Sequence, residues 1–242
     1  MIPRIIHQTG PADPSLYNNL WIHGQSEWKR LYQGFEYYLW DDDDIDAFMV
    51  TYYPQYVDNY RSLPLHIHQI DISRLFLLHK YGGIYADLDY IPYTNFYRRL
   101  DNSFNIVESS SSREVVQNCL MASPAGTDDM LGLIDHIFHA CNTVPFVDIS
   151  TCGKKALDAY VLKTSGPNAI GSYIDNMEHF KLDQSKFNAF GLSKIDSEVV
   201  GSHHLTGVWG NTTLDRFSDI DEFKEFHANW FFRNRASFEF SY

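Results

Sequence analysis

Residues 67–92 read IHQIDISRLFLLHKYGGIYADLDYIP and predict the central part of the fold. In residues 67–81 the apolar side chains recur at helical spacing, which predicts a helix. The pair Gly82-Gly83 ends that helix, because glycine takes the left-handed backbone conformation without a Cβ penalty. Residues 84–86 then predict a short buried strand. The expected unit is a helix, a glycine break and a strand that ends at acidic residues.

Asp87 and Asp89 follow the predicted strand and are two residues apart. On an extended backbone their side chains point the same way, and Leu88 faces the core. Two such carboxylates repel each other unless a cation lies between them, and Mn²⁺ and Mg²⁺ take carboxylates together with substrate phosphates. The alternative is a pair of solvated loop acids. Asp71 and Arg74 favour the cation site, because they share a face of the preceding helix.

These residues form a combined pattern, which is Asp71-x-x-Arg74 followed by Tyr81-Gly82-Gly83-Ile84-Tyr85-x-Asp87-x-Asp89. The pattern resembles the core of the glycosyltransferases with a DXD-containing sugar-binding region. That family, glycosyltransferase family 32, includes relatives of the yeast initiating α-1,6-mannosyltransferase and of capsular and toxin sugar transferases. The resemblance implies that the chain is a hexosyltransferase.

The composition suits one globular domain, because 44% of the 242 residues are hydrophobic. A net charge of −12 argues against nucleic acid as a partner. Cys119, Cys141 and Cys152 lack metal-ligand spacing, so we expect a reducing compartment. No apolar run approaches the ~20 residues of a transmembrane helix, and the N-terminus predicts a strand instead of a signal peptide. We expect a soluble, cytoplasmic protein, in the host cytoplasm if it is viral.

The N-terminal residues 2–10 read IPRIIHQTG and predict a first strand that opens into a loop. Members of the same family begin in a similar way. Ligands of such folds bind beyond the carboxyl ends of parallel strands, so His7, Gln8 and Thr9 are candidate nucleotide contacts. The alternative is that these three residues only cap a turn at the end of the strand.

The rest of the chain alternates between helical and extended patterns. Residues 41–44 are four aspartates, which either bind a ligand or begin a helix, since acids stabilise the positive end of the helix dipole. The other predicted elements are helices over residues 15–32, 45–50, 129–141 and 154–162, and strands over residues 37–40, 105–108 and 115–121. This alternation predicts an α/β fold with a mostly parallel central sheet.

Two further segments resemble the family. Gly166 and Pro167 match a turn that opens a helix near the donor sugar, although an ordinary turn is the alternative. His203 matches the histidine of a pattern that continues to Gly207 and Trp209, and it has His204 beside it. Imidazole binds Mn²⁺ more readily than Mg²⁺, which favours Mn²⁺ as the cofactor. The expected metal ligands are Asp87, Asp89 and His203, with His204 left as an alternative to His203.

The resemblance implies one Rossmann-like nucleotide-sugar transferase domain of the GT-A type over residues 1–242. The reaction it implies moves a hexose from a UDP- or GDP-sugar to an acceptor hydroxyl, with retention of the anomeric configuration. Asp71, Arg74 and Asp89 are the expected catalytic residues, and Asp71, Arg74 and Asp87 are also expected to hold the donor. The last ~30 residues are expected to pack against the core or to form a homo-oligomer.

Two other functions use the same residues. A nucleotide-sugar hydrolase would transfer the sugar to water, so only its need for an acceptor separates it from a transferase. A non-catalytic sugar-binding module would not need the metal site. A Rossmann dehydrogenase is disfavoured, because no Gly-x-Gly-x-x-Gly sequence follows the first strand.

Overall fold

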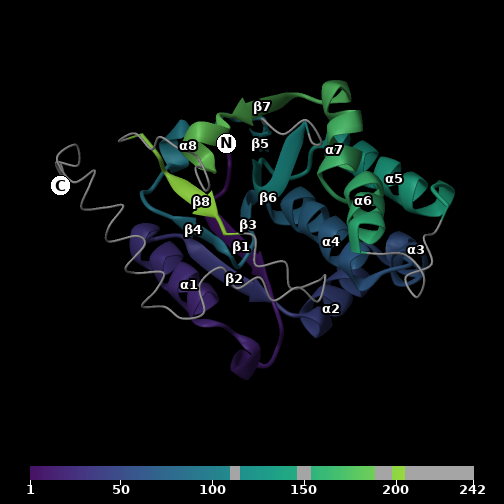
Figure 1. Ribbon diagram of the computed structural model, residues 1–242, viewed down its shortest axis with the longest axis horizontal. Coiled ribbons are helices and arrows are strands. Elements are labelled where there is room, and N and C mark those ends of the chain that lie inside the picture. Colours follow the sequence, from purple (N-terminus) through teal and green to yellow (C-terminus); the bar gives the residue numbers. More distant parts are fainter. Residues whose placement is uncertain (110–114, 146–153, 189–197, 205–242) are drawn as a thin grey trace.

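The computed structural model describes residues 1–109, 115–145, 154–188 and 198–204 (Figure 1). The strands in this part of the chain are β1 (Ile5–Thr9), β2 (Glu36–Trp40), β3 (Gly83–Ala86), β4 (Tyr90–Pro92), β5 (Phe104–Glu108), β6 (Val116–Ser123), β7 (His179–Leu182) and β8 (Gly201–His203). The α-helices are α1 (Asn19–Leu31), α2 (Asp42–Tyr52), α3 (Val57–Arg61), α4 (His66–Tyr81), α5 (Asp128–Thr143), α6 (Lys154–Thr164), α7 (Pro167–Tyr173) and α8 (Gln184–Phe187).

Six strands form one mixed, mostly parallel sheet in the order β2-β1-β3-β6-β5-β7. β1 runs parallel to β2 and β3, and β5 runs parallel to β7. β6 is antiparallel to both of its neighbours, β3 and β5. β4 and β8 pair with each other in a separate antiparallel ribbon. The predicted α/β class is confirmed, and its mostly parallel sheet contains the antiparallel strand β6.

Helices cover both faces of the sheet (Figure 1). α2, α4, α5 and α7 pack on one face around residues 75–78 of α4, which are fully buried. α1 and the β4–β8 ribbon contribute to the core of the other face, where Trp28 lies close to Tyr90. Successive residues of β3 alternate between the two cores, because Ile84 belongs to the α1 side and Tyr85 to the α4 side.

The glycine pair ends α4 as predicted. Gly82 has φ of 65° and Gly83 has φ of 98°, both in the region that glycine adopts more easily than other residues. A Cβ atom on Gly83 would lie 2.5 Å from the carbonyl oxygen of Ile5. The absence of a side chain therefore lets β3 lie directly against β1, which places the end of β3 beside the end of β1.

The two N-terminal helices begin at capping residues. The helix predicted from residue 15 begins at Asn19 instead, because residues 14–16 form a separate 3-10 turn and Asn18 accepts a hydrogen bond from the backbone N–H of Trp21 at 2.9 Å. The helix start predicted at the four aspartates is confirmed. Asp41 caps α2, and it forms a capping box with Asp44.

Three predictions concern residues outside the described part of the chain. They are those on Cys152, on Gly207 and Trp209, and on the C-terminal extension. Cys119 and Cys141 lie within the described part, and both are buried, free thiols. None of the helices in the described ranges is long and apolar enough to cross a bilayer.

Candidate active site

Asp87 and Asp89 both lie in a tight turn at the end of β3. The backbone N–H of Asp87 donates to the carbonyl of Cys119 in β6 at 2.9 Å, and the carbonyl of Asp87 accepts from the N–H of Tyr90 at 3.0 Å. The expectation of an extended backbone at these residues is therefore wrong, because the chain turns here to enter β4. Leu88 faces inward as predicted, with 6% of its surface exposed.

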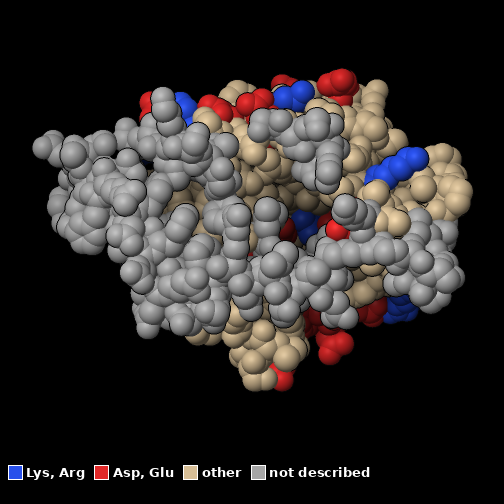
Figure 2. All heavy atoms as spheres, viewed as in Figure 1, with Lys and Arg blue, Asp and Glu red and all other residues tan. Residues whose placement is uncertain are grey.

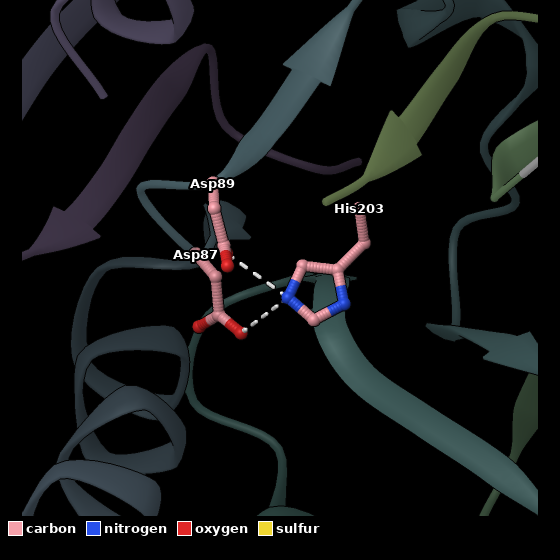
Figure 3. Close-up of side chains that lie close together, drawn as sticks. All are labelled: Asp87, Asp89 and His203. Atoms are coloured by element: carbon pink, nitrogen blue, oxygen red, sulfur yellow. Dashed lines mark ion pairs between the residues drawn. The ribbon is translucent and has the colours of Figure 1, made fainter. Parts of the chain in front are cut away.

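His203 is brought to the two aspartates by the β4–β8 ribbon, where it pairs with Tyr90 (Figure 3). Its Nε2 lies 2.9 Å from Oδ1 of Asp89 and 3.7 Å from Oδ2 of Asp87. His204 is buried and its Nε2 lies 2.9 Å from Oγ of Ser202, away from this group. Of the two neighbouring histidines, the structure therefore places His203 with the aspartates.

The donor set of this group fits a divalent cation. One ligand atom from each of Asp87, Asp89 and His203 lies within 4.8 Å of the others. Ligands that share one ion at ~2.1 Å are at most about 4.2 Å apart, so a shift of a few tenths of an ångström would close the group around a metal. Two carboxylates and one imidazole suit Mn²⁺, and they leave room in its shell for phosphate oxygens.

The electrostatics of the group favour a positive charge between the carboxylates. Burial alone would lower the pKa of His203, but Asp89 and Cys119 beside it raise that pKa well above its ordinary value. Burial raises the pKa of Asp87, against the attraction of Arg74 and His203. Without a metal, a proton on His203 supplies the positive charge that stabilises the buried Asp89 and the half-buried Asp87.

Arg74 links the helix α4 to the aspartate turn. Its guanidinium lies 2.9 Å from Oδ1 of Asp71 and 3.2 Å from Oδ1 of Asp87, and it donates to the carbonyl of Asn118 at 3.0 Å. The guanidinium also lies over the ring of Tyr85, 4.8 Å from its centre. Only 4% of Arg74 is exposed. The side chain is therefore held in one place by four neighbours.

Asp71 lies behind Arg74 and is 4% exposed. Besides Arg74, its carboxylate accepts hydrogen bonds from Oγ of Ser165 at 2.6 Å and from Nδ2 of Asn118 at 3.3 Å. These three contacts make Asp71 an anchor that joins α4 to β6 and to the segment before α7. Its predicted contact with the donor sugar remains a prediction.

Tyr85, Asn118 and Ser165 belong to this network, although sequence reasoning did not assign them to the site. Tyr85 donates to Oδ1 of Asp87 at 3.0 Å, and its hydroxyl lies 2.9 Å from that of Thr9. The alternation of strand residues could have indicated Tyr85, which is two residues before Asp87 and shares its face. Nothing in the local sequence indicates that Asn118 or Ser165 would reach Asp71.

His7, Gln8 and Thr9 lie in β1, and the loop begins only at Gly10. Their backbones pair with β2 through Thr9, so all three belong to the strand that was predicted within residues 2–10. His7 and Gln8 have no exposed surface, and Gln8 donates to the carbonyl of Asp87 at 3.0 Å. Their side chains therefore support the aspartate turn from within the sheet, while their contact with a nucleotide remains a prediction.

Gly166 and Pro167 stand at the start of α7. Gly166 is its N-cap residue, and Pro167 occupies the first turn, where its missing N–H costs no hydrogen bond. The N–H of Gly166 donates to the carbonyl of Val161 at 2.9 Å, which turns the chain sharply after α6. This turn holds Ser165 against Asp71, so it supports the network of Arg74. A contact of these two residues with the donor stays a prediction.

The burial of His7 predicts that the fold loses stability in acid. Its Nε2–H donates to the carbonyl of Gly82 at 2.9 Å, and its Nδ1 accepts from Nε1–H of Trp40 at 3.1 Å. Burial lowers the pKa of His7 from 6.5 to about 4, so the neutral ring is the folded form. The stabilisation of the fold by neutral His7 is fully present above pH 6.5. It is lost as the pH falls toward 4, because the unfolded chain binds the proton first.

The expected loss from His7 is about 2 kcal/mol of unfolding free energy between pH 7.5 and pH 5. Urea unfolding of the wild type and of His7→Gln at both pH values would measure it. Glutamine can still donate to Gly82 but does not titrate, so the variant should show a smaller pH dependence. Equal pH dependences in the two proteins would contradict this role of His7.

Comparisons with known proteins match the part of the chain that contains Arg74, Asp87 and Asp89. Residues 18–111 match the family described as "Glycosyltransferase sugar-binding region containing DXD motif". The "Inositol phosphoceramide mannosyltransferase 3" of Schizosaccharomyces pombe is 41% identical over 88 residues, which are 36% of this chain and 24% of that protein. The "Mannosyl phosphorylinositol ceramide synthase CSH1" of Saccharomyces cerevisiae is 38% identical over 89 residues, which are 37% of this chain and 23% of that protein. The chain thus matches about a quarter of the length of these relatives.

Two solved structures share the fold. "PaToxG Glycosyltransferase" superposes with a TM-score of 0.50 and 15% identity, over 72% of this chain and 69% of that one. The ligand-free glycosyltransferase domain of the YGT toxin superposes with a TM-score of 0.51 and 9% identity, over 72% of this chain and 77% of that one. The fold is therefore the GT-A glycosyltransferase fold. Residues 18–111 carry the DXD-containing sugar-binding region, so the resemblance seen in the sequence is confirmed there.

Proposed function

We propose that this chain is a metal-dependent glycosyltransferase that moves a hexose from a nucleoside-diphosphate sugar to an acceptor hydroxyl. The observation that carries the proposal is the convergence of Asp87, Asp89 and His203, whose ligand atoms lie within 4.8 Å of one another beside the buried Arg74. The aspartates and Arg74 lie in the stretch that matches the DXD region. Two relatives are named as mannose-transferring enzymes, so mannose is the first hexose to test.

The chemistry requires charge stabilisation at the leaving group. As the bond to the anomeric carbon breaks, negative charge develops on the nucleoside diphosphate. A divalent cation, Mn²⁺ or Mg²⁺, would supply the opposing charge when bound. Asp87, Asp89 and His203 would hold it, and the neutral imidazole that this requires would have given up its proton.

Arg74 is placed to add a second positive charge. Its two terminal nitrogens bind Asp71, Asp87 and the carbonyl of Asn118. Its Nε is buried and has no hydrogen-bond partner among the described residues. This buried N–H costs free energy, which a donor oxygen would recover only if the side chains that cover Nε move aside. The anchors of Arg74 keep it oriented before the donor arrives, so less ordering is needed during the reaction.

A screen of nucleotide sugars in Mn²⁺ tests the proposal. Release of nucleoside diphosphate would be measured from GDP-mannose, UDP-glucose and UDP-galactose, first alone and then with sugar acceptors. A transferase should turn over faster when an acceptor is added, whereas a hydrolase should not. Wild-type protein that releases nucleotide equally well in EDTA would contradict a metal-dependent reaction.

From the family resemblance described above, we also predict that the product keeps the anomeric configuration of the donor. A covalent route would need an enzyme carboxylate free to attack the anomeric carbon. Asp71, the other acid that contacts Arg74 besides Asp87, is held by Arg74, Ser165 and Asn118. We therefore expect the acceptor to attack from the face that the phosphate leaves, with a phosphate oxygen taking the proton.

NMR of the first-formed product from an α-linked donor should show an α anomer. A β anomer would overturn retention. Intact-mass measurement with a slow donor should detect no glycosyl-enzyme, and an adduct on Asp71 would keep retention but replace the route.

A further inference from the structure

His68 is a buried histidine that has no part in the reaction proposed above. It lies in α4, three residues before Asp71, so the two side chains share a face of the helix. The centre of its ring lies 5.5 Å from that of Tyr160 in α6, and none of its surface is exposed. Figure 2 shows a hollow near the middle of one face of the molecule, in which acidic and basic atoms are both visible. Because His68 is not exposed, it can act on a ligand in such a hollow only through other residues.

The hydroxyl of Thr164 identifies the nitrogen of His68 that carries the proton. Oγ1 of Thr164 donates its hydrogen to the carbonyl oxygen of Tyr160, which lies 2.7 Å away. The same Oγ1 lies 3.0 Å from Nε2 of His68. Since a hydroxyl has one hydrogen and two lone pairs, Nε2–H of His68 is the donor in this second bond. The neutral ring of His68 therefore ties α4 to Thr164, the last residue of α6.

Histidine is a costly side chain at this position. Nδ1 of His68 is buried and has no hydrogen-bond partner among the described residues, which costs free energy. Burial also lowers the pKa of His68, although the carboxylate of Asp71 acts in the opposite direction. A leucine would avoid both penalties, but it could not donate to Thr164. The contribution that requires a histidine here is therefore the bond from Nε2–H.

The bond to Thr164 also restrains the residue that follows it. Oγ of Ser165 donates to Oδ2 of Asp71 at 2.6 Å. One face of α4 thus holds two consecutive residues, Thr164 through His68 and Ser165 through Asp71. If the bond from His68 is lost, Thr164 is free to move away from α4. Ser165 then moves with it, because the two residues share a peptide bond.

Asp71 connects Ser165 to Arg74. Oδ2 of the carboxylate is held by Ser165, and Oδ1 lies 2.9 Å from the guanidinium of Arg74. A carboxylate that loses Ser165 can rotate and draw Oδ1 away from the guanidinium. The same guanidinium lies 3.2 Å from Oδ1 of Asp87, so a shift of Arg74 also changes the charges beside the proposed metal group.

We propose that His68 is a positioning residue for Arg74 and that it acts through Thr164, Ser165 and Asp71. Loss of the bond from Nε2–H should lower turnover, although no group that touches the donor is removed. This inference rests on the proposed function, because it assumes that the guanidinium of Arg74 acts on the donor.

The kcat of His68→Leu and His68→Gln tests the inference, measured as release of nucleoside diphosphate from a saturating nucleotide sugar in Mn²⁺. Leucine removes the N–H and should lower kcat roughly 10-fold, because a displacement of ~1 Å at a catalytic group costs about 100-fold and Arg74 keeps its other contacts. Glutamine can place its Nε2–H where that of histidine lies, so its kcat should stay close to that of the wild type. Rates are compared at a temperature at which melting curves show every variant folded.

Thr164→Val removes the same hydrogen bond from the other side, with little change in size. Its kcat should fall as in His68→Leu, which keeps the test decisive if leucine disturbs the fold. His136→Leu is the matched control. Nε2 of His136 lies 2.9 Å from Oγ of Ser172, so this substitution removes a histidine–hydroxyl contact between α5 and α7. That contact does not involve Asp71, and the kcat of the control should be unchanged.

A double substitution shows whether the effect passes through Ser165. Ser165→Ala should lower kcat by itself. Adding His68→Leu should then cause little further loss, because the connection to Asp71 is already broken. A residue that served only the stability of the fold would not show this dependence on Ser165.

The outcomes separate the inference from the proposed function. If the wild type turns over a nucleotide sugar while His68→Leu and Thr164→Val keep its kcat, the inference fails and the proposed function stands. Equal losses in His68→Gln and His68→Leu would also overturn the inference, as would an undiminished loss when His68→Leu is added to Ser165→Ala. If the wild type turns over no nucleotide sugar, both the proposed function and the inference fail.

Discussion

Asp89→Asn is expected to lower glycosyl transfer by roughly 10²–10³-fold, the range found when one stabilising contact to a developing charge is removed. Asparagine keeps the shape of the side chain but removes the charge that lies 2.9 Å from Nε2 of His203. The remaining ligands, Asp87 and His203, would hold a divalent cation less tightly. Initial rates with a saturating donor, measured across a Mn²⁺ titration, would show this loss.

A direct measurement of Mn²⁺ binding separates this effect from a damaged fold. Affinity from calorimetry should fall in Asp89→Asn and should be unchanged in Asp43→Asn, the same substitution at an exposed acid on α2. The melting temperature of the two variants in EDTA should be close to that of the wild type. Wild-type rates in Asp89→Asn, or full activity of the wild type in EDTA, would contradict the proposed metal site.

Arg74→Lys is expected to lower turnover by about 100-fold although the charge is kept, because displacement of a catalytic group by ~1 Å has effects of this size. Arginine contacts Asp71, Asp87 and the carbonyl of Asn118 with two separate nitrogens. Lysine has a single nitrogen and cannot reproduce that fork. It would also lose the contact with the ring of Tyr85. Rates and Km values should be measured together, since a misplaced donor changes both.

Arg61→Lys provides the control for Arg74→Lys. Arg61 is paired with Asp46 on the surface, and 52% of its side chain is exposed. Exposed pairs of this kind contribute ~0.2–1 kcal/mol, so the control should change neither rate nor melting temperature appreciably. Normal turnover with a lowered melting temperature in Arg74→Lys would show that Arg74 serves only the fold.

The site can be described as an arrangement of charges around one strand end. The carboxylates at the end of β3 face His203 on one side and Arg74 on the other. Because each positive group is itself held by neighbours, the site is organised without the donor. We therefore expect the donor to bind with little rearrangement of β3, α4 and β8.

Several features of the fold follow from local sequence, because they depend on backbone conformation and on hydrophobic spacing. The helix α4, its end at Gly82 and Gly83, and the strand β3 were all predictable, since glycine permits the positive φ angles that a side chain disfavours. Asp41 likewise predicted the start of α2 through a cap that spans only three residues. The carboxylate pair could also be predicted, because its members are neighbours in sequence.

Other features depend on contacts between distant segments, which no local pattern contains. Asp87 and Asp89 meet His203 only because β8 pairs with β4, and that pairing also selects His203 over His204. Asp71 meets Ser165 across 94 residues, and Arg74 meets Asn118 across 44. The burial of His7 and Gln8 also depends on this packing, because β1 lies between β2 and β3 and their side chains bond to Gly82 and Asp87. Sequence by itself determined which residues could carry the chemistry, and tertiary structure decided which of them stand together, since long-range packing brings their side chains within bonding distance.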